Sequence, residues 1–275
     1  MIVLLDQQRY TAHPHWVDAA YSTGVTSVAV LSDGRVAILL RGQPAKIRVF
    51  NTQAELVDEW TLTGLLTVHK LTALPDGGVL VCDVDGHQLH ALDAQGQLQW
   101  QLGKPDNPQW QAPFNHPTHA VSTPDGRLFI TDGYGNSCIH EFNAEREWVR
   151  TFGSAGQSIT DGATFSVPHS IVHDGTHLYV ADRENSRVVV LDEQGTVQRL
   201  ITPVYKPMSV ALHPTGNLLV SDQTASLSIF TPQGDLLGRC RITSVYGHSI
   251  SCNQDGHIFI AEMLPDRITC LIPLD

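Results

Sequence analysis

Hydrophobic residues along this chain fall into short runs that are separated by turn signals. The runs are apolar throughout or alternate with polar residues, and most are next to an Asp-Gly, Thr-Gly or Gln-Gly pair. Val36–Leu40, which follows Asp33-Gly34, is one example. Runs of this kind are typical of β-strands. No stretch has the spacing of a long amphipathic helix, so the pattern predicts an all-β chain.

The runs repeat as a unit of about 40 residues, made of apolar strands with a turn between them. Six copies follow one another, at 25–50, 68–96, 116–142, 165–195, 207–234 and 247–272. Units of this length, each a small antiparallel sheet, are typical of β-propellers. We therefore predict a single six-bladed β-propeller domain over residues 1–275.

The ends of the chain predict how such a ring closes. The sixth unit has only three strands before Asp275, while Met1 to Leu5 are apolar and strand-like. We expect this N-terminal strand to complete the last blade, which leaves no open sheet edge. We expect loops between blades at 104–112 and 154–164. The aromatic residues that bracket the first loop, Trp100 and Trp110, are expected to pack rather than to serve a site.

Composition narrows the classes of function. The formal charge is −11 and no Lys/Arg run is present, which argues against nucleic acid and anionic membranes as partners. No segment has the roughly 18 consecutive apolar residues of a membrane span, and the first residues do not resemble a signal peptide. The five cysteines form no Cys-x-x-Cys pair, so we expect reduced thiols. Together these features predict a cytoplasmic protein, expected to be a monomer.

One position of the repeat carries histidine in every second unit. Alignment of the units on their turns and strand-end acids places Thr26, His69, Thr118, His169, Met208 and His248 at equivalent points of the innermost strands. In a propeller these strands surround the central channel, so the three histidines would point at the axis from alternate blades. Three imidazoles with an open fourth position are typical of catalytic zinc sites.

A single histidine at such a position is more often structural. Only the recurrence of histidine in every second unit favours a site that the three residues share. An alignment error of one residue in the second unit would weaken the argument. We expect the histidines that do not recur at this position to lie on the surface: His13, His15, His87, His90, His173 and His177. His116 and His119 flank a ring position and are candidates for the mouth of the channel.

A second set of residues lies just after the strand-end position of the repeat. Arg41 and Arg183 occupy this position in units one and four, which lie opposite each other in a six-membered ring, and Tyr134 lies two residues past Asp132. Two guanidiniums near a metal favour a carboxylate ligand. A tyrosine between them could have a lowered pKa and act as a general base. The alternative is a salt bridge from Arg183 to a neighbour such as Glu184, with Tyr134 as a packing residue.

Three motifs resemble those of the peptidyl-α-hydroxyglycine α-amidating lyases, a family of NHL-repeat propellers. They are Asp132-Gly-Tyr-Gly-Asn-Ser-Cys-Ile139, Phe165-Ser-Val-Pro-His-Ser170 and Val180-Ala-Asp-Arg-Glu-Asn-Ser-Arg187. The resemblance is dense over about 114–200. Elsewhere it depends on His69, His248 and Arg41-Gly42.

That family cleaves peptidyl-α-hydroxyglycine into a peptide amide and glyoxylate. The resemblance implies Zn²⁺ on His69, His169 and His248. It implies Tyr134 as the base on the substrate hydroxyl, and Arg41 and Arg183 as the residues that place the substrate carboxylate and support the phenolate.

The sequence departs from the family pattern at three positions. An acidic residue that follows the last zinc histidine in the family serves a structural Ca²⁺ there, but it is Ser249 here, which puts a calcium site in doubt. Gly135 stands where animal enzymes have a disulfide cysteine, and Tyr246 stands for a methionine. This chain has no copper-hydroxylase domain, so the expected substrate is a small molecule or peptide with a carboxylate, such as a smaller hydroxyglycine-type carbinolamide.

Two other readings are open. One is a non-catalytic NHL-repeat propeller that binds a protein on its rim, which a metal-free axis would favour. The other is a propeller hydrolase such as a lactonase, whose metal ligands are usually rich in carboxylates whereas this ring is rich in imidazoles.

Overall fold

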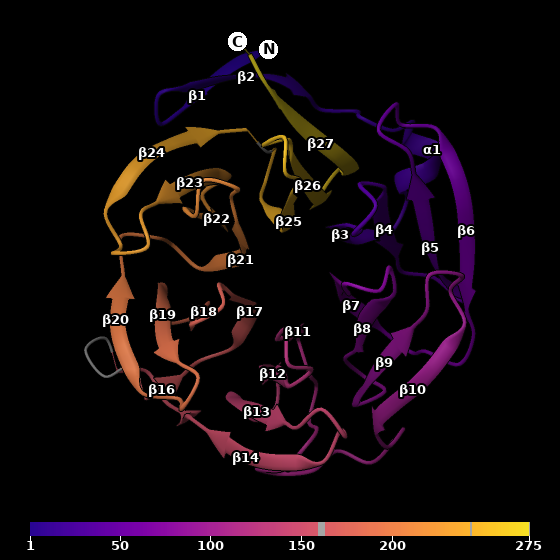
Figure 1. The fold of residues 1–275 in the computed structure, drawn as a ribbon, viewed down its shortest axis with the longest axis vertical. Coiled ribbons are helices and arrows are strands. Elements are labelled where there is room, and N and C mark those ends of the chain that lie inside the picture. The colour runs from indigo at the N-terminus through magenta and orange to yellow at the C-terminus, as the bar shows by residue number, and fades with distance from the viewer. Residues whose placement is uncertain (159–162, 243, 275) are drawn as a thin grey trace.

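The computed structural model describes residues 1–158, 163–242 and 244–274. Six antiparallel sheets are arranged around a central axis, with the strands β3, β7, β11, β17, β21 and β25 innermost (Figure 1). This is the predicted six-bladed β-propeller. The described residues contain no helix with the length and hydrophobicity that a membrane span needs.

The first three blades each have four strands in chain order from the axis outward. Blade one is β3 (Val25–Val30), β4 (Val36–Leu40), β5 (Ala45–Phe50) and β6 (Leu56–Leu62). Blade two is β7 (Val68–Ala73), β8 (Val79–Asp83), β9 (Gln88–Leu92) and β10 (Leu98–Gly103). Blade three is β11 (His119–Ser122), β12 (Leu128–Asp132), β13 (Cys138–Phe142) and β14 (Trp148–Phe152).

The next two blades follow the same order. Blade four is β17 (Pro168–His173), β18 (His177–Asp182), β19 (Arg187–Asp192) and β20 (Val197–Ile201). Blade five is β21 (Pro207–Leu212), β22 (Leu218–Asp222), β23 (Ser226–Phe230) and β24 (Leu236–Arg241). A short helix, α1 (Ala19–Ser22), precedes blade one.

Blade six is closed by the N-terminal segment. Its strands are β25 (Gly247–Cys252), β26 (Ile258–Met263), β27 (Asp266–Pro273), β2 (Gln8–His13) and β1 (Ile2–Leu5). The prediction that the N-terminus closes the last blade is therefore right, but the strand assignment is wrong. The fourth strand is β2, whose Tyr10 and Ala12 are buried, and β1 folds back on it as a fifth, outer strand. The two termini consequently lie side by side (Figure 1).

The core consists of apolar layers between neighbouring blades. The middle strands are buried on both faces, which explains continuous apolar runs such as Val36–Leu40. The outer strands are mostly exposed and alternate in burial, as in Leu98–Gly103. One hydrophobic cluster joins blades one and two, and another joins blades four and five. Packing between sheets thus holds each inner strand against the channel.

Both predicted loops connect blades, with one qualification. The segment 104–112 has no strand, whereas the segment 154–164 contains β15 (Ser154–Ala155) and the first residue of β16 (Thr164–Phe165), which pair in parallel. Its residues 159–162 lie outside the described residues. The packing prediction holds for Trp100, which lies against a core cluster and under the Arg146 guanidinium. It is wrong for Trp110, which is 72% exposed.

Candidate metal and catalytic site

Three buried histidines converge on the propeller axis from alternate blades. His69, His169 and His248 are the second residues of β7, β17 and β25. Their ring centroids are separated by 4.7, 4.8 and 5.0 Å, and their candidate ligand atoms lie within 4.8 Å of one another. The sequence alignment therefore places them correctly, on blades two, four and six.

A local irregularity of the strand aims each ring at the channel. The pairing register shifts between Val68 and Leu71, between Pro168 and Ser170, and between Gly247 and Ser249. A β-bulge leaves one residue out of the ladder and redirects its side chain. In each of these three blades, the histidine is the residue skipped, or one of the residues skipped.

The hydrogen bonds of the three rings fix which nitrogen faces the axis. Nδ1 of His69 donates to the carbonyl of Thr118 at 2.7 Å, since a carbonyl can only accept. Nδ1 of His169 contacts the Met208 carbonyl at 2.7 Å, and Nδ1 of His248 contacts the Thr26 carbonyl at 2.6 Å. Each Nε2 therefore keeps its lone pair for the site. A second-nitrogen hydrogen bond of this kind is usual in metal-binding histidines.

The electrostatic surroundings keep these imidazoles neutral. Burial lowers the pKa of His69, His169 and His248 well below its usual value, because a charged ring would lose its solvation. The charge of Lys70 lowers the pKa of all three rings further, and neighbouring histidines add to this effect at His69 and His169. A neutral imidazole is the form that binds a metal, so the three inward-facing nitrogens fit a divalent ion.

Tyr134 reaches the same point from the loop after β12. Its hydroxyl lies 3.0 Å from Nε2 of His169 and 3.1 Å from Nε2 of His69. Both nitrogens are acceptors, and the hydroxyl has one hydrogen, so it can donate to only one of them at a time. The residue is 41% exposed, yet its hydroxyl points down among the rings. The expected lowering of its pKa is wrong for this state. Burial raises the pKa of the Tyr134 phenol, and Arg183 and Arg41 offset part of that effect.

Glycines on both sides of Tyr134 let its loop approach neighbouring backbone closely. A Cβ at Gly133 would lie 2.3 Å from the carbonyl oxygen of Pro168, and one at Gly135 would lie 2.3 Å from the side chain of Asn115. The Asp132-Gly-Tyr-Gly-Asn136 sequence therefore fits this contact between blades three and four because it carries no side chain at those two positions.

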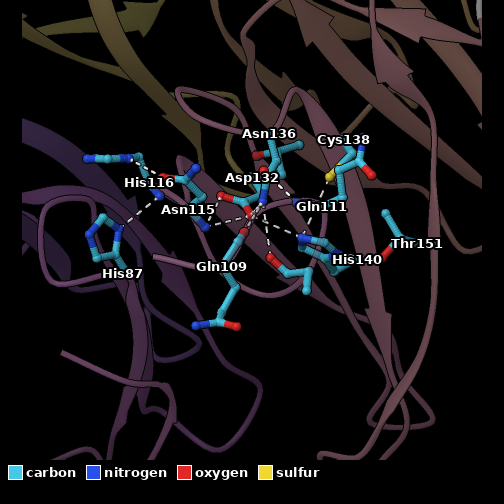
Figure 2. Close-up of polar contacts among 12 residues, drawn as sticks. His87, Gln109, Gln111, Asn115, His116, Asp132, Asn136, Cys138, His140 and Thr151 are labelled. Carbon is cyan, nitrogen blue, oxygen red and sulfur yellow. Dashed lines mark hydrogen bonds and ion pairs between the residues drawn. The ribbon is translucent and has the colours of Figure 1, made fainter. Parts of the chain in front are cut away.

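Asp132 and Asn136 pin the two ends of this loop (Figure 2). The buried Asp132 carboxylate accepts hydrogen bonds from the Asn115 backbone nitrogen, from Asn136 Nδ2 at 2.8 Å and from His140 Nε2 at 3.0 Å. Asn136 in turn bonds the backbone of the 104–112 loop region at Gln109 and Gln111. This network fixes the position of Tyr134 without touching it.

The same network explains a second cluster of possible metal ligands. Asp132, Cys138 and His140 are buried with their ligand atoms within 4.8 Å of one another. The carboxylate oxygens are already in hydrogen bonds, and Nδ1 of His140 contacts the Thr151 hydroxyl at 2.7 Å. Other blades use a strand-end acid in the same way, as Asp182 does toward the backbone nitrogen of Ser166 and Asp83 toward that of Thr67. We assign this cluster to anchoring the loop.

The two arginines lie on the Tyr134 side of the histidines, on opposite blades. Arg183 stacks over the Tyr134 ring with its guanidinium carbon 5.4 Å from the ring centroid, and its Nη1 lies 3.4 Å from the hydroxyl. It also pairs with Glu184 at 2.9 Å, so the salt bridge considered as an alternative exists alongside this contact. Arg41 donates from Nε to the Val68 carbonyl at 3.1 Å, and most of its side chain remains open to solvent.

Several other histidines lie elsewhere than the sequence suggested. His119 is half-buried at the end of the channel away from Tyr134, where its Nδ1 accepts from Ile171 N and its Nε2 donates to Thr72. It lines a cavity at that end and not the mouth next to Tyr134. His116 is next to the Tyr134 loop through its carbonyl, 3.3 Å from Tyr134 N. His87 and His90 are buried rather than on the surface, whereas His13 and His15 are exposed.

Sequence reasoning missed one residue, Lys70. It directly follows His69 and is 1% exposed, and its Nζ donates to the backbone carbonyls of Met208 and His248. The available signal was a lysine at a position of the repeat where the other units carry Ser or His. Ser249, at the corresponding position of blade six, hydrogen-bonds Ser27 at 3.0 Å, so its hydroxyl serves the contact between blades.

Known proteins resemble this chain in sequence and in fold. No protein-family model matches the chain. A probable peptidyl-alpha-hydroxyglycine alpha-amidating lyase of Caenorhabditis elegans is 28% identical over 244 residues, which cover 81% of this chain and 68% of that protein. The peptidylglycine alpha-amidating monooxygenase of Rattus norvegicus is 40% identical over 129 residues, which cover 44% of this chain but only 13% of the rat protein.

Solved structures support the fold. A streptogramin B lyase structure superimposes with a TM-score of 0.68 over 99% of this chain and 100% of that chain, at 12% identity. At such low identity the likeness concerns the propeller architecture alone. Fold and sequence together show that this chain is a six-bladed β-propeller related in sequence to the peptidyl-α-hydroxyglycine α-amidating lyases.

Proposed function

We propose that this protein is a zinc-dependent lyase that cleaves the C–N bond of an N-acyl- or peptidyl-α-hydroxyglycine. The products are an amide and glyoxylate. The observation that carries the proposal is the placement of the Tyr134 hydroxyl within 3.1 Å of two inward-facing histidine nitrogens, with arginines on the same side. The Caenorhabditis elegans relative, which is named as a probable lyase of this kind, supports the reaction class.

His69, His169 and His248 would hold the ion through Nε2. An ion bound there supplies a Lewis acid toward the substrate hydroxyl oxygen. Zinc is proposed because three neutral imidazoles with an open position suit it well. The single orientation of the three rings, set by their Nδ1 hydrogen bonds, supports this assignment.

Tyr134 is proposed as the general base. It must first lose its own proton, which the positive charges of Arg183 and Arg41 favour. The phenolate then takes the proton of the substrate hydroxyl. The electrons of that O–H bond form the carbonyl of glyoxylate as the C–N bond breaks. The amide nitrogen keeps the electrons of the C–N bond and takes the proton from Tyr134, so atoms and charge balance.

Arg41 and Arg183 are proposed to bind the substrate carboxylate. Guanidinium groups pair with carboxylates through two hydrogen bonds and so fix their orientation. Binding the carboxylate from opposite blades would place the hydroxyl-bearing carbon over the histidines and next to Tyr134. Positioning of this kind lowers the entropic part of the barrier.

Glyoxylate release from α-hydroxyhippurate tests the proposal. The protein is assayed as purified, after chelation, and after Zn²⁺ is restored. We expect turnover that chelation abolishes and Zn²⁺ restores. Metal-independent turnover, or none under any condition, would contradict it. A metal-free protein without activity would favour the other reading, a propeller that binds a protein on its rim.

A further inference from the structure

A relay of hydrogen bonds runs around the channel at the level of the histidines. At this level five of the six ring residues donate from their side chains to a backbone carbonyl at the inner strand of the next blade. Five such bonds exist: Thr26 to His69 O (3.0 Å), His69 to Thr118 O (2.7 Å), Thr118 to Pro168 O (2.6 Å), His169 to Met208 O (2.7 Å) and His248 to Thr26 O (2.6 Å). The relay ties every ligand histidine to its neighbours.

Met208 interrupts this relay between blades five and six. Its thioether has no hydrogen to donate. The carbonyl that would accept from it, His248 O, is instead contacted by Lys70 Nζ. Lys70 belongs to blade two, so its side chain crosses the channel to reach blade six. The same Nζ lies 3.2 Å from Met208 O, the carbonyl that also accepts from His169.

The position of Lys70 in the repeat shows that its role differs from that of its equivalents. At this position the other five residues accept a hydrogen bond from a backbone N–H of the next blade. They are Ser27 (Leu71 N), His119 (Ile171 N), Ser170 (Val210 N), Ser209 (Ile250 N) and Ser249 (Val28 N). A lysine cannot accept. Instead, Lys70 Nζ donates to two carbonyls on the far side of the channel, those of Met208 and His248.

We propose that Lys70 is a positioning residue for the metal site: it supplies from across the channel the hydrogen bond to His248 O that Met208 cannot give. This inference depends on the proposed role of the three histidines as metal ligands. Lys70 holds the backbone of His248 directly. It holds the imidazole of His169 indirectly, because Lys70 Nζ and His169 Nδ1 share one acceptor, Met208 O. It therefore sets the distance between two of the three ligands.

The test compares metal affinity in K70M with that in the intact protein. Methionine fills a similar volume but donates nothing. Removal of a residue that orients ligands typically weakens metal binding about 10- to 100-fold. We expect such a loss for Zn²⁺ and Co²⁺ measured by competition with a chelator, and an altered Co²⁺ absorption spectrum. Thermal unfolding of the metal-free forms establishes that K70M folds, and K70Q, whose amide is too short to span the channel, replaces it if K70M does not.

Adding M208T to K70M shows whether Lys70 positions the metal ligands or has only a general structural role. Thr26 and Thr118 already donate to the next blade from this ring position, so the introduced threonine should donate to His248 O and restore most of the affinity lost in K70M. M208T alone is the control and should bind metal as the intact protein does. Unchanged affinity in K70M, or a loss that M208T does not restore, would overturn the inference.

Failure of the inference about Lys70 can be distinguished from failure of the proposed lyase reaction. An intact protein that binds Zn²⁺ but releases no glyoxylate would contradict the proposed function and leave the comparison of K70M with the double variant valid. An intact protein that binds no metal would overturn the ligand assignment and the inference about Lys70 with it.

Discussion

The phenolic oxygen of Tyr134 lies 3.0 Å from Nε2 of His169. Because Nδ1 of the same ring donates to a backbone carbonyl, this Nε2 is an acceptor, and the phenol is the donor between them. The proposed base and a proposed metal ligand are thus in contact before any substrate arrives. Five expectations follow from this arrangement and from the loop and channel around it.

Removal of one ligand should abolish metal binding. H169A leaves two imidazoles, and we expect metal affinity to fall by more than about 100-fold, beyond what loss of a supporting residue costs. Competition with a chelating dye measures the affinity. H15A, which alters an exposed histidine, should bind metal normally. An H169A protein that retains one tightly bound ion would show that the ligands lie elsewhere.

Removal of the Tyr134 hydroxyl should separate metal binding from turnover. Y134F keeps all three histidines, so its metal content should equal that of the intact protein, while kcat falls about 10²- to 10⁴-fold through loss of the general base. Y205F, on an exposed tyrosine, is the matched control. Normal turnover in Y134F would remove Tyr134 from the mechanism.

The arginines should act through the substrate carboxylate. We expect R41M to lower kcat/KM for α-hydroxyhippurate by about 10- to 100-fold, since a charged hydrogen-bonding partner contributes roughly 1.5 to 3 kcal/mol. N-(hydroxymethyl)benzamide, which lacks the carboxylate, should be cleaved equally by R41M and the intact protein. Arg35, at the other end of the same strand, supplies the control R35M. Equal losses on both substrates would contradict carboxylate binding.

The loop that carries Tyr134 should depend on Asp132. D132N replaces a buried acceptor of several hydrogen bonds with a group that must also donate. We expect the free energy of unfolding to fall by about 3 kcal/mol, within the range for breaking a buried charged network. Urea denaturation measures it, with D235N at an exposed position as the control. Stability equal to that of the control would contradict the anchoring role.

Stability of the metal-free protein should decline in acid partly because of His119. Burial lowers the pKa of His119 to about 3 in the folded chain, against a usual value of about 6.5 when unfolded. Between these values the unfolded state binds one more proton, so unfolding is favoured as pH falls. The contribution is roughly 1.4 kcal/mol per pH unit below about 6.5 and ceases below about 3.

H119Q tests this contribution, because a glutamine can accept from Ile171 N and donate to Thr72 without titrating. We expect urea denaturation at a series of pH values to show that the free energy of unfolding of H119Q depends less steeply on pH. The difference in slope should correspond to one proton. H15Q should leave the slope unchanged. An H119Q slope equal to that of the intact protein would show that His119 stays neutral in both states or charges in both.

The sequence repeat made two features predictable, the fold and the recurrence of histidine at one position of alternate blades. Turn pairs such as Asp33-Gly34 mark each unit, and alignment of the units on these turns places His69, His169 and His248 at equivalent positions although their spacing along the chain is unequal. The N-terminal strand order was less predictable, because Ile2–Leu5 and Gln8–His13 are both strand-like and only the buried Tyr10 decides which one pairs with β27.

Residues that act across the channel were not predictable from the repeat. Lys70 breaks the rule of its position, and its partners on blades five and six are far away in sequence. Burial of His90 follows from its place in β9, a strand buried on both faces, and burial of His87 and exposure of Trp110 depend on the paths of loops. The pKa of Tyr134 depends on its depth in the site, which its position in a motif does not reveal.

The most direct test is the metal content of the purified protein, determined by elemental analysis beside that of the triple variant H69A/H169A/H248A. The account predicts one zinc ion per chain in the intact protein and none in the variant. A folded intact protein without stoichiometric metal, or a variant that keeps it, would contradict the central claim that these three histidines form a metal site.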